Sequence, residues 1–268
     1  MPLHDSILIE RRFCGPPASA NGGYAAGRLA AALGEGIQHS IQVRLHRPPP
    51  LDVPLTVNKQ ATDTAQLTNR GELVATAKRT GSDPPPFAPA SLDQAELATQ
   101  ALDPNHHPFP HCFVCGPLRE HRDGLRIFPG AIPHTDTFAA VWTPDQHLSS
   151  SGTQVPSEFV WAALDCASGV PLLLSDPNSR PCVLATITVR LQASPAVAEP
   201  HIVTSKVTGI EGRKRFSQAM LSTTDGAIYA ISSAIWIELA TPIGRGPTEG
   251  RDPRRSMRWI AQHSGGTK

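Results

Sequence analysis

One segment of this chain occurs twice, and this repeat limits the folds that the chain can adopt more than any other feature. Seven residues of the pattern I-x-V-R-L-x3-P-x4-P-x2-V recur at one constant offset of 146 residues, as from Ile41 to Ile187. The first copy ends at Val57 and the second at Val203. Two unrelated strands would not share so detailed a pattern, so we expect two copies of one domain. A chain of 268 residues has room for two domains of about 100–150 residues each.

The composition argues against several classes of partner. A formal net charge of +1 gives no overall attraction to nucleic acid. The five cysteines are an odd number and mostly lie far apart, unlike the disulfide framework of a secreted domain. The N-terminus has no apolar signal segment, and no apolar run approaches the roughly 20 residues of a membrane helix. We therefore expect a cytoplasmic protein without a nucleic-acid or membrane partner.

Each half of the chain predicts one helix and a series of strands. The segment Ala25–Leu33 is rich in strong helix formers, Ser19 or Asn21 can cap it, and Gly34 can end it. The strands expected after it are Ser40–Leu45, Pro54–Gln60, Ala65–Thr68 and Leu73–Arg79. The second half predicts the strand Phe138–Trp142, the helix Pro156–Cys166 and the strands Leu184–Leu191, Pro200–Val207, Arg215–Thr223 and Ile228–Glu238. Matching hairpin turns are expected at Asn69-Arg70-Gly71 and Thr224-Asp225-Gly226.

These elements give each half an α+β layout, in which an antiparallel β-sheet wraps a central helix. We predict an N-terminal domain at 1–90, a linker with a short helix at 91–106 and a second domain at 107–242. The basic tail at 243–268 is rich in Gly and Pro and is expected to be mobile. The second copy is longer than the first, and we place its insertion around Ser175–Arg180.

Three short segments resemble those of a known family. They are Asn21-Gly22-Gly23 before a small-residue helix, Val160-Trp-Ala-Ala-Leu-Asp165 in the second helix, and Cys112-Phe-Val-Cys115-Gly116 followed by Gly124-Leu125-Arg126-Ile127. In this order they resemble hotdog-fold acyl-CoA thioesterases, and more closely the fused double-hotdog proteins of the PaaI-like or thioesterase-like group. That family has His where this chain has Asn21. The resemblance covers most of residues 7–240 and implies a tandem hotdog fold that acts on a small acyl-CoA thioester.

The two predicted helices divide the family's motif between them when they are aligned at a constant offset of 135 residues. The first helix keeps Gly22-Gly23, where the second has Ser157-Glu158. The second helix keeps Asp165, where the first has Ala30. The resemblance therefore implies one composite active site between the halves, and a second equivalent site that has lost hydrolase chemistry.

The resemblance also implies roles for these residues. Asn21, Gly22 and Gly23 would form the oxyanion side, because unpaired N–H groups at a helix N-terminus favour developing negative charge. Asp165 would attack the thioester or activate water, with coenzyme A as part of the substrate and no separate cofactor. In the alternative interpretation Asp165 is a buried structural carboxylate, and the chain is a non-catalytic acyl or acyl-CoA binding protein. An enoyl-CoA hydratase is a further alternative.

Two groups of residues are candidates for ligand binding. Arg213, Lys214 and Arg215 suit the phosphates of coenzyme A, although a solvated loop between strands explains them as well. Tyr24 and Trp161 lie near the starts of the two predicted helices. They either pack in the core or form part of the wall of an acyl pocket.

The pair Cys112 and Cys115 has two further interpretations. With His106, His107 and His111 just before it, the pair could belong to a zinc site, but a second paired motif is missing. A redox pair would need a thioredoxin-like βαβ context, which is also missing. We therefore expect no metal and interpret the segment as the entry into the second sheet. We also consider pairing of two chains into a homodimer of double hotdogs.

Overall fold

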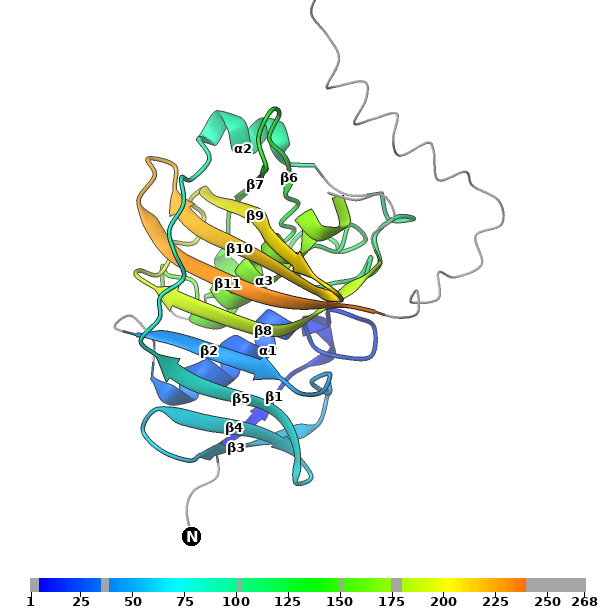
Figure 1. Cartoon of the computed structure of the whole chain (residues 1–268), viewed down its shortest axis with the longest axis vertical. Coiled ribbons are helices and arrows are strands. Elements are labelled where there is room, and N and C mark those ends of the chain that lie inside the picture. The colour runs from blue at the N-terminus through cyan, green and yellow to red at the C-terminus, as the bar shows by residue number, and fades with distance from the viewer. Residues whose placement is uncertain (1–4, 35–38, 101–102, 150–151, 175–179, 240–268) are drawn as a thin grey trace, which may run out of the picture.

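The computed structural model describes residues 5–34, 39–100, 103–149, 152–174 and 180–239 (Figure 1). The predicted tail at 243–268 lies outside the described residues, and so does most of the predicted insertion, 175–179. Within the described residues, two helices lie behind one large antiparallel sheet (Figure 1). The α+β class predicted from the sequence is confirmed, while the predicted domain boundaries stay predictions.

The sheet has eleven strands, and strands of the two halves meet in its middle. The first half contributes, in spatial order, β1 (Asp5–Leu8), β3 (Pro54–Lys59), β4 (Thr64–Asn69), β5 (Glu72–Thr80) and β2 (Ser40–Leu45). The second half continues with β8 (Cys182–Leu191), β11 (Ile228–Glu238), β10 (Lys214–Thr223), β9 (His201–Glu211), β7 (Thr137–Trp142) and β6 (Gly130–Ala131). Nine of these strands were predicted from the sequence to within a few residues at their ends. The short edge strands β1 and β6 were not.

The junction between the halves is formed by the repeated strands themselves. β2 pairs antiparallel with β8, so that Ile41 lies opposite Val189 and Val43 lies opposite Ile187. The offset of 146 residues converts one of these pairs into the other, as an approximate two-fold axis between the halves requires. Gln42 Nε2 donates a hydrogen bond to its own counterpart, Thr188 Oγ1, across the junction (3.2 Å).

Two helices fill the space on one side of this sheet. α1 (Gly22–Ala30) continues as a 3₁₀ turn, η2 (Ala31–Leu33), and α3 (Ser157–Leu174) crosses it with a long run of buried residues. α3 is longer than the predicted helix and continues through Pro171. By length and composition alone α3 could cross a membrane, but 72% of it is buried inside the fold. This burial makes α3 a core helix of the fold.

The remaining elements connect and close the two halves. Two further 3₁₀ turns are η1 (Arg11–Phe13) and η3 (Gln146–Leu148). α2 (Leu92–Ala98) begins with a capping box, in which the Ser91 and Gln94 side chains each accept from the other's backbone N–H. It packs on β7 and closes a small satellite core of Ala95, Ala98, Ile132, Ala139 and Ile202. At the predicted turn after Asn69, Arg70 and Gly71 both have positive φ (50° and 85°), the geometry of a type I′ hairpin.

Candidate functional site

Helices α1 and α3 cross with their backbones in contact, because glycine occupies both contact positions of α1. A Cβ atom on Gly23 would lie 2.4 Å from Asp165 Cβ and 2.5 Å from the Trp161 carbonyl oxygen. A Cβ atom on Gly27 would lie 2.7 Å from Glu158 Cα. These glycines therefore allow a close helix crossing, whereas the sequence analysis assigned Gly23 only to the oxyanion side.

The crossing brings the two halves of the predicted composite site together. The Gly23 N–H at the start of α1 donates to Asp165 Oδ2 on α3, with 2.7 Å between nitrogen and oxygen. The Asp165 side chain is buried, at 2% exposure, and its Oδ1 has no hydrogen-bond partner. The Asp165 carboxylate thus already binds the Gly23 N–H group, which the sequence analysis assigned to the oxyanion of the reaction. No gap separates the carboxylate from this N–H group.

Burial changes the acidity of this carboxyl group. Loss of hydration raises the pKa of Asp165 to about 7, and the nearby Cys112 thiol adds to the rise. The Gly23 N–H and the Asn21 side chain favour the charged form and offset part of this effect. A carboxyl group with this pKa exists in both protonation states near neutral pH, as a general acid or base requires.

Asn21 and Gly22 have structural tasks at the same helix end. Asn21 is the N-cap of α1: its Oδ1 accepts from the Tyr24 N–H (2.8 Å), and its Nδ2 donates to Cys166 Sγ (3.4 Å). A Cβ atom on Gly22 would lie 3.0 Å from a methyl carbon of Leu184. Gly22 therefore packs against the strand β8 and lies beside the carboxylate contact without taking part in it.

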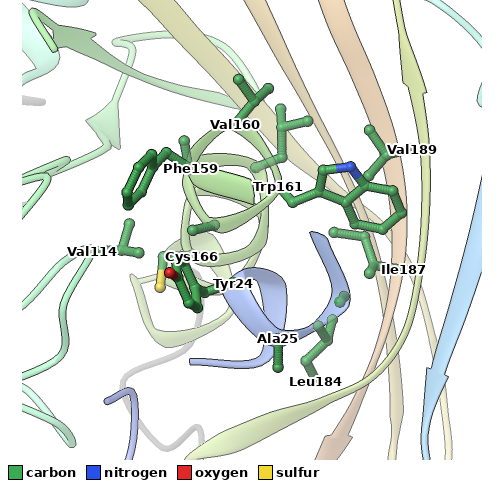
Figure 2. Packing of buried hydrophobic residues seen from close by; sticks show 14 of the residues in the cluster. Tyr24, Ala25, Val114, Phe159, Val160, Trp161, Cys166, Leu184, Ile187 and Val189 are labelled. Atoms are coloured by element: carbon green, nitrogen blue, oxygen red, sulfur yellow. The ribbon is translucent and has the colours of Figure 1, made fainter. Parts of the chain in front are cut away.

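Tyr24 and Trp161 lie on opposite sides of the helix crossing. Figure 2 shows Trp161 between α3 and the strand residues Ile187 and Val189, with Tyr24 and Phe159 on the other side. Tyr24 is buried and stacks on the Phe13 ring at 4.2 Å between centroids. Both predicted ligand-binding residues are thus core residues in this structure.

The basic segment forms the tip of the β9–β10 hairpin and is engaged in contacts within the protein. Arg215 forms an ion pair with Glu238 on β11, and Arg213 Nε donates to the Glu238 carbonyl oxygen (3.0 Å). Lys214 Nζ lies 4.0 Å from the exposed Glu211 carboxylate. Of these three cations, Arg215 is the most firmly held, because Glu238 neutralises its charge in a partly buried position.

A cluster of thiols next to Asp165 was not found from the sequence. The Sγ atoms of Cys112, Cys115 and Cys166 all lie within 4.8 Å of one another, and all three residues are buried. The sequence paired Cys112 and Cys115 only with the preceding histidines, none of which joins the three thiols. His106 pairs with Asp103 (3.1 Å). Cys166 lies 51 residues after Cys115, so no sequence motif links the two cysteines. Its only distinguishing feature in the sequence is that it follows Asp165.

The two-fold axis also places an equivalent of the composite site on the other side of the crossing. At the offset of 135 residues, Glu158 is the equivalent of Gly23, and Ala30 is the equivalent of Asp165. A small hollow of about 10 Å³ lies there and is lined by Ala30, Ala31, Ile41, Ser157, Trp161, Val189 and Leu191. None of these seven residues carries a carboxylate or an imidazole, and the loss of hydrolase chemistry at this second site stays a prediction.

Solved structures of other proteins share this arrangement over nearly the whole chain. A conserved protein of unknown function from Alicyclobacillus acidocaldarius, described as having a hot dog fold, matches with a TM-score of 0.59 and 15% identity, over 89% of this chain and 93% of its own. The chain adopts the hotdog fold twice. The tandem hotdog fold predicted from the sequence is thereby confirmed.

Two further neighbours of this tandem hotdog protein carry functional names. The tesB protein of Mycobacterium avium subs paratuberculosis matches with a TM-score of 0.57 and 11% identity, over 88% of this chain and 93% of its own. The acyl-CoA thioesterase II TesB2 of Mycobacterium marinum matches with a TM-score of 0.53 and 11% identity, over 87% and 92%. At these identities the likeness concerns the fold. No protein-family model and no curated protein matches the sequence.

Proposed function

We propose that this tandem hotdog protein hydrolyses thioesters of the acyl-CoA type at a composite site of Gly23 and Asp165. The observation that carries the proposal is the 2.7 Å hydrogen bond from the Gly23 N–H to Asp165 Oδ2. It joins a helix N-terminus of one half to a carboxylate of the other, the two components that acyl transfer needs. Two of the solved proteins with this fold are named tesB or acyl-CoA thioesterase II.

The proposed reaction begins with an exchange at the Gly23 N–H. The thioester carbonyl oxygen takes the place of the Asp165 carboxylate, so that the N-terminus of α1 stabilises the charge that develops on this oxygen. Asp165, now free, removes a proton from the attacking water, or attacks the carbonyl carbon itself and forms an anhydride that water then cleaves. In either case the C–S bond breaks, and the coenzyme A thiolate leaves and takes up a proton. Because Asp165 is 2% exposed, the helix crossing must open to admit the substrate. Coenzyme A enters as part of the substrate, and the proposal needs no separate cofactor.

A specific observation favours a second candidate, a non-catalytic acyl or acyl-CoA binding protein. In the structure the Gly23 N–H is already bonded to Asp165, and Gly22 packs against Leu45 and Leu184. A scaffold that had lost its chemistry would look the same if the crossing never opened. Only a functional measurement separates the two candidates.

The decisive experiment measures thiol release from a panel of acyl-CoA chain lengths by wild type, Asp165→Asn and Glu158→Gln. Glu158 is the matched control, because it occupies the equivalent of the Gly23 position at the other site. We expect Asp165→Asn to lower turnover by about 10²–10⁴-fold, the usual contribution of a general base, while Glu158→Gln keeps it. Far-UV circular dichroism checks that both variants are folded, and a sample without substrate corrects for the protein's own five cysteines.

Each outcome of this panel has a separate meaning. Unchanged turnover in Asp165→Asn would remove Asp165 from the mechanism. Tight binding of acyl-CoA without thiol release would favour the binding protein. Loss of an enoyl double bond with the thioester intact would identify a hydratase.

The hairpin cations provide a test of the nucleotide part of the substrate. Arg215 is unsuitable for mutation, because its loss would take the nearer of two cations, Arg215 and Arg180, away from the partly buried Glu238. We therefore expect the double variant Arg213→Glu, Lys214→Glu to raise KM for acyl-CoA about tenfold or more, since charge-assisted phosphate contacts are strong. The control is a thioester of the same acyl group without the nucleotide, whose KM should not change. An equal rise for both substrates would place the hairpin outside the nucleotide site.

A further inference from the structure

The three-thiol cluster of Cys112, Cys115 and Cys166 has the geometry of a metal site. The Sγ atoms of Cys112 and Cys166 lie 3.7 Å apart, and all three sulfur atoms lie within 4.8 Å of one another. In a tetrahedral zinc site with Zn–S bonds of about 2.3 Å, neighbouring sulfur atoms are about 3.8 Å apart. The sulfur atoms thus already lie close to the positions that a tetrahedral thiophilic ion would need.

The backbone around the pair Cys112 and Cys115 forms a tight turn that depends on a glycine. Gly116 closes a tight turn by donating its N–H to the Cys112 carbonyl oxygen (2.9 Å). A Cβ atom on Gly116 would lie 2.5 Å from that oxygen, so only glycine fits.

A second observation indicates that this cluster lacks a partner. Asp165, the neighbour of Cys166 in the sequence, keeps a buried Oδ1 without any hydrogen bond, and its charge acts on both Cys112 and Cys115. Burying such an oxygen without a partner is costly. A cation on the sulfur atoms would lower this cost, because its positive charge would attract the buried carboxylate.

We propose that Cys112, Cys115 and Cys166 bind a thiophilic divalent cation, with zinc as the metal that this set of ligands fits best. The bound thiols lose their protons to solvent as the metal–sulfur bonds form. His107 is not one of the ligands. Its Nδ1 accepts from the Phe109 N–H (3.0 Å), which leaves the proton of the neutral ring on Nε2. The site joins the segment before the second sheet to α3 and lies beside the Gly23–Asp165 contact.

The test is metal analysis of the full chain purified under reducing conditions, loaded with zinc and dialysed. We expect about one zinc ion per chain, the stoichiometry of a single structural site. Cys112→Ser and Cys166→Ser should fall to background, while Cys14→Ser and Cys182→Ser keep the metal. Cys14 is the matched buried control, because its thiol contacts the His111 carbonyl oxygen and Arg119 instead of the cluster.

Two measurements on the wild type avoid any doubt about folding of the variants. Cobalt loading should give the thiolate-to-metal absorption bands of a tetrahedral site, and zinc should protect three thiols from alkylation until a chelator is added. A folded, reduced protein that shows neither cobalt bands nor thiol protection would overturn the proposal. So would a disulfide between two cluster cysteines, seen as three free thiols in the unfolded chain in place of the five it contains, because a bonded pair cannot supply two thiolates.

Discussion

Asn21 makes two separable contacts at the start of α1, one with its own helix and one with α3. Its Oδ1 caps the helix through the Tyr24 N–H, and its Nδ2 donates to Cys166 Sγ. We expect Asn21→Ala to lower the free energy of unfolding by about 1 kcal/mol, the usual cost of losing an N-cap. Asn21→Ser should lose less, because serine also caps helices. Urea unfolding, monitored by circular dichroism, measures the free energy of unfolding of both variants. Equal losses of this free energy would show that the N-cap hydrogen bond does not contribute to the effect.

At the residue scale, the sequence predicted contacts within one motif but not contacts between distant segments. The cap at Asn21 was predictable because a polar side chain precedes a run of helix formers. The approach of Gly23 to Asp165 was predictable because the two aligned helices had divided one motif. The neighbours of Cys166 were not, since local pattern contains no information on which loop packs against a helix 51 residues later.

At the scale of elements, the α1–α3 crossing depends on two glycines in one contact. We expect Gly23→Ala and Gly27→Ala each to lower the free energy of unfolding by about 1–3 kcal/mol, because their Cβ atoms would enter α3. The double variant should cost less than the sum of the two, since the first methyl group already separates the helices. Urea unfolding of the four proteins completes the cycle.

The control for this cycle is Gly81→Ala, because a Cβ atom at Gly81 would meet nothing within 4 Å. It should change the free energy of unfolding by no more than about 0.5 kcal/mol. Strict additivity of Gly23→Ala and Gly27→Ala would mean that the two glycines do not belong to one rigid contact.

The elements that the sequence missed share physical causes. β1 and β6 are short edge strands of four and two residues, too short for an alternating pattern to emerge. α3 extends past Cys166 because it is buried on nearly all sides, so its later turns show no amphipathic period and its Pro171 looks like a helix end. By contrast, β2 was predicted with the same bounds that the structure has, Ser40–Leu45, because it lies in the repeated segment.

At the scale of the whole molecule, the two halves share one sheet and one hydrophobic core. The main core cluster contains residues from both halves, from Ile7 to Trp236, and the sheet continues through the β2–β8 junction. The Gly23–Asp165 contact, which is the proposed site, and the adjacent thiol cluster both lie in this shared interior. A hotdog half without its partner would expose the strand edge and the helix face that the other half covers.

This shared core predicts that the chain unfolds in a single cooperative transition. All four tryptophans lie after residue 107, so their fluorescence reports the second half and, through Trp161, its contact with α1. Leu67 lies on β4 in the first half and is fully buried. We expect Leu67→Ala to cost about 2–5 kcal/mol and to shift the fluorescence and circular dichroism transitions in urea together. Leu97→Ala, at an exposed leucine, should shift neither. If Leu67→Ala left the urea midpoint of the fluorescence transition unchanged, the two halves would unfold independently.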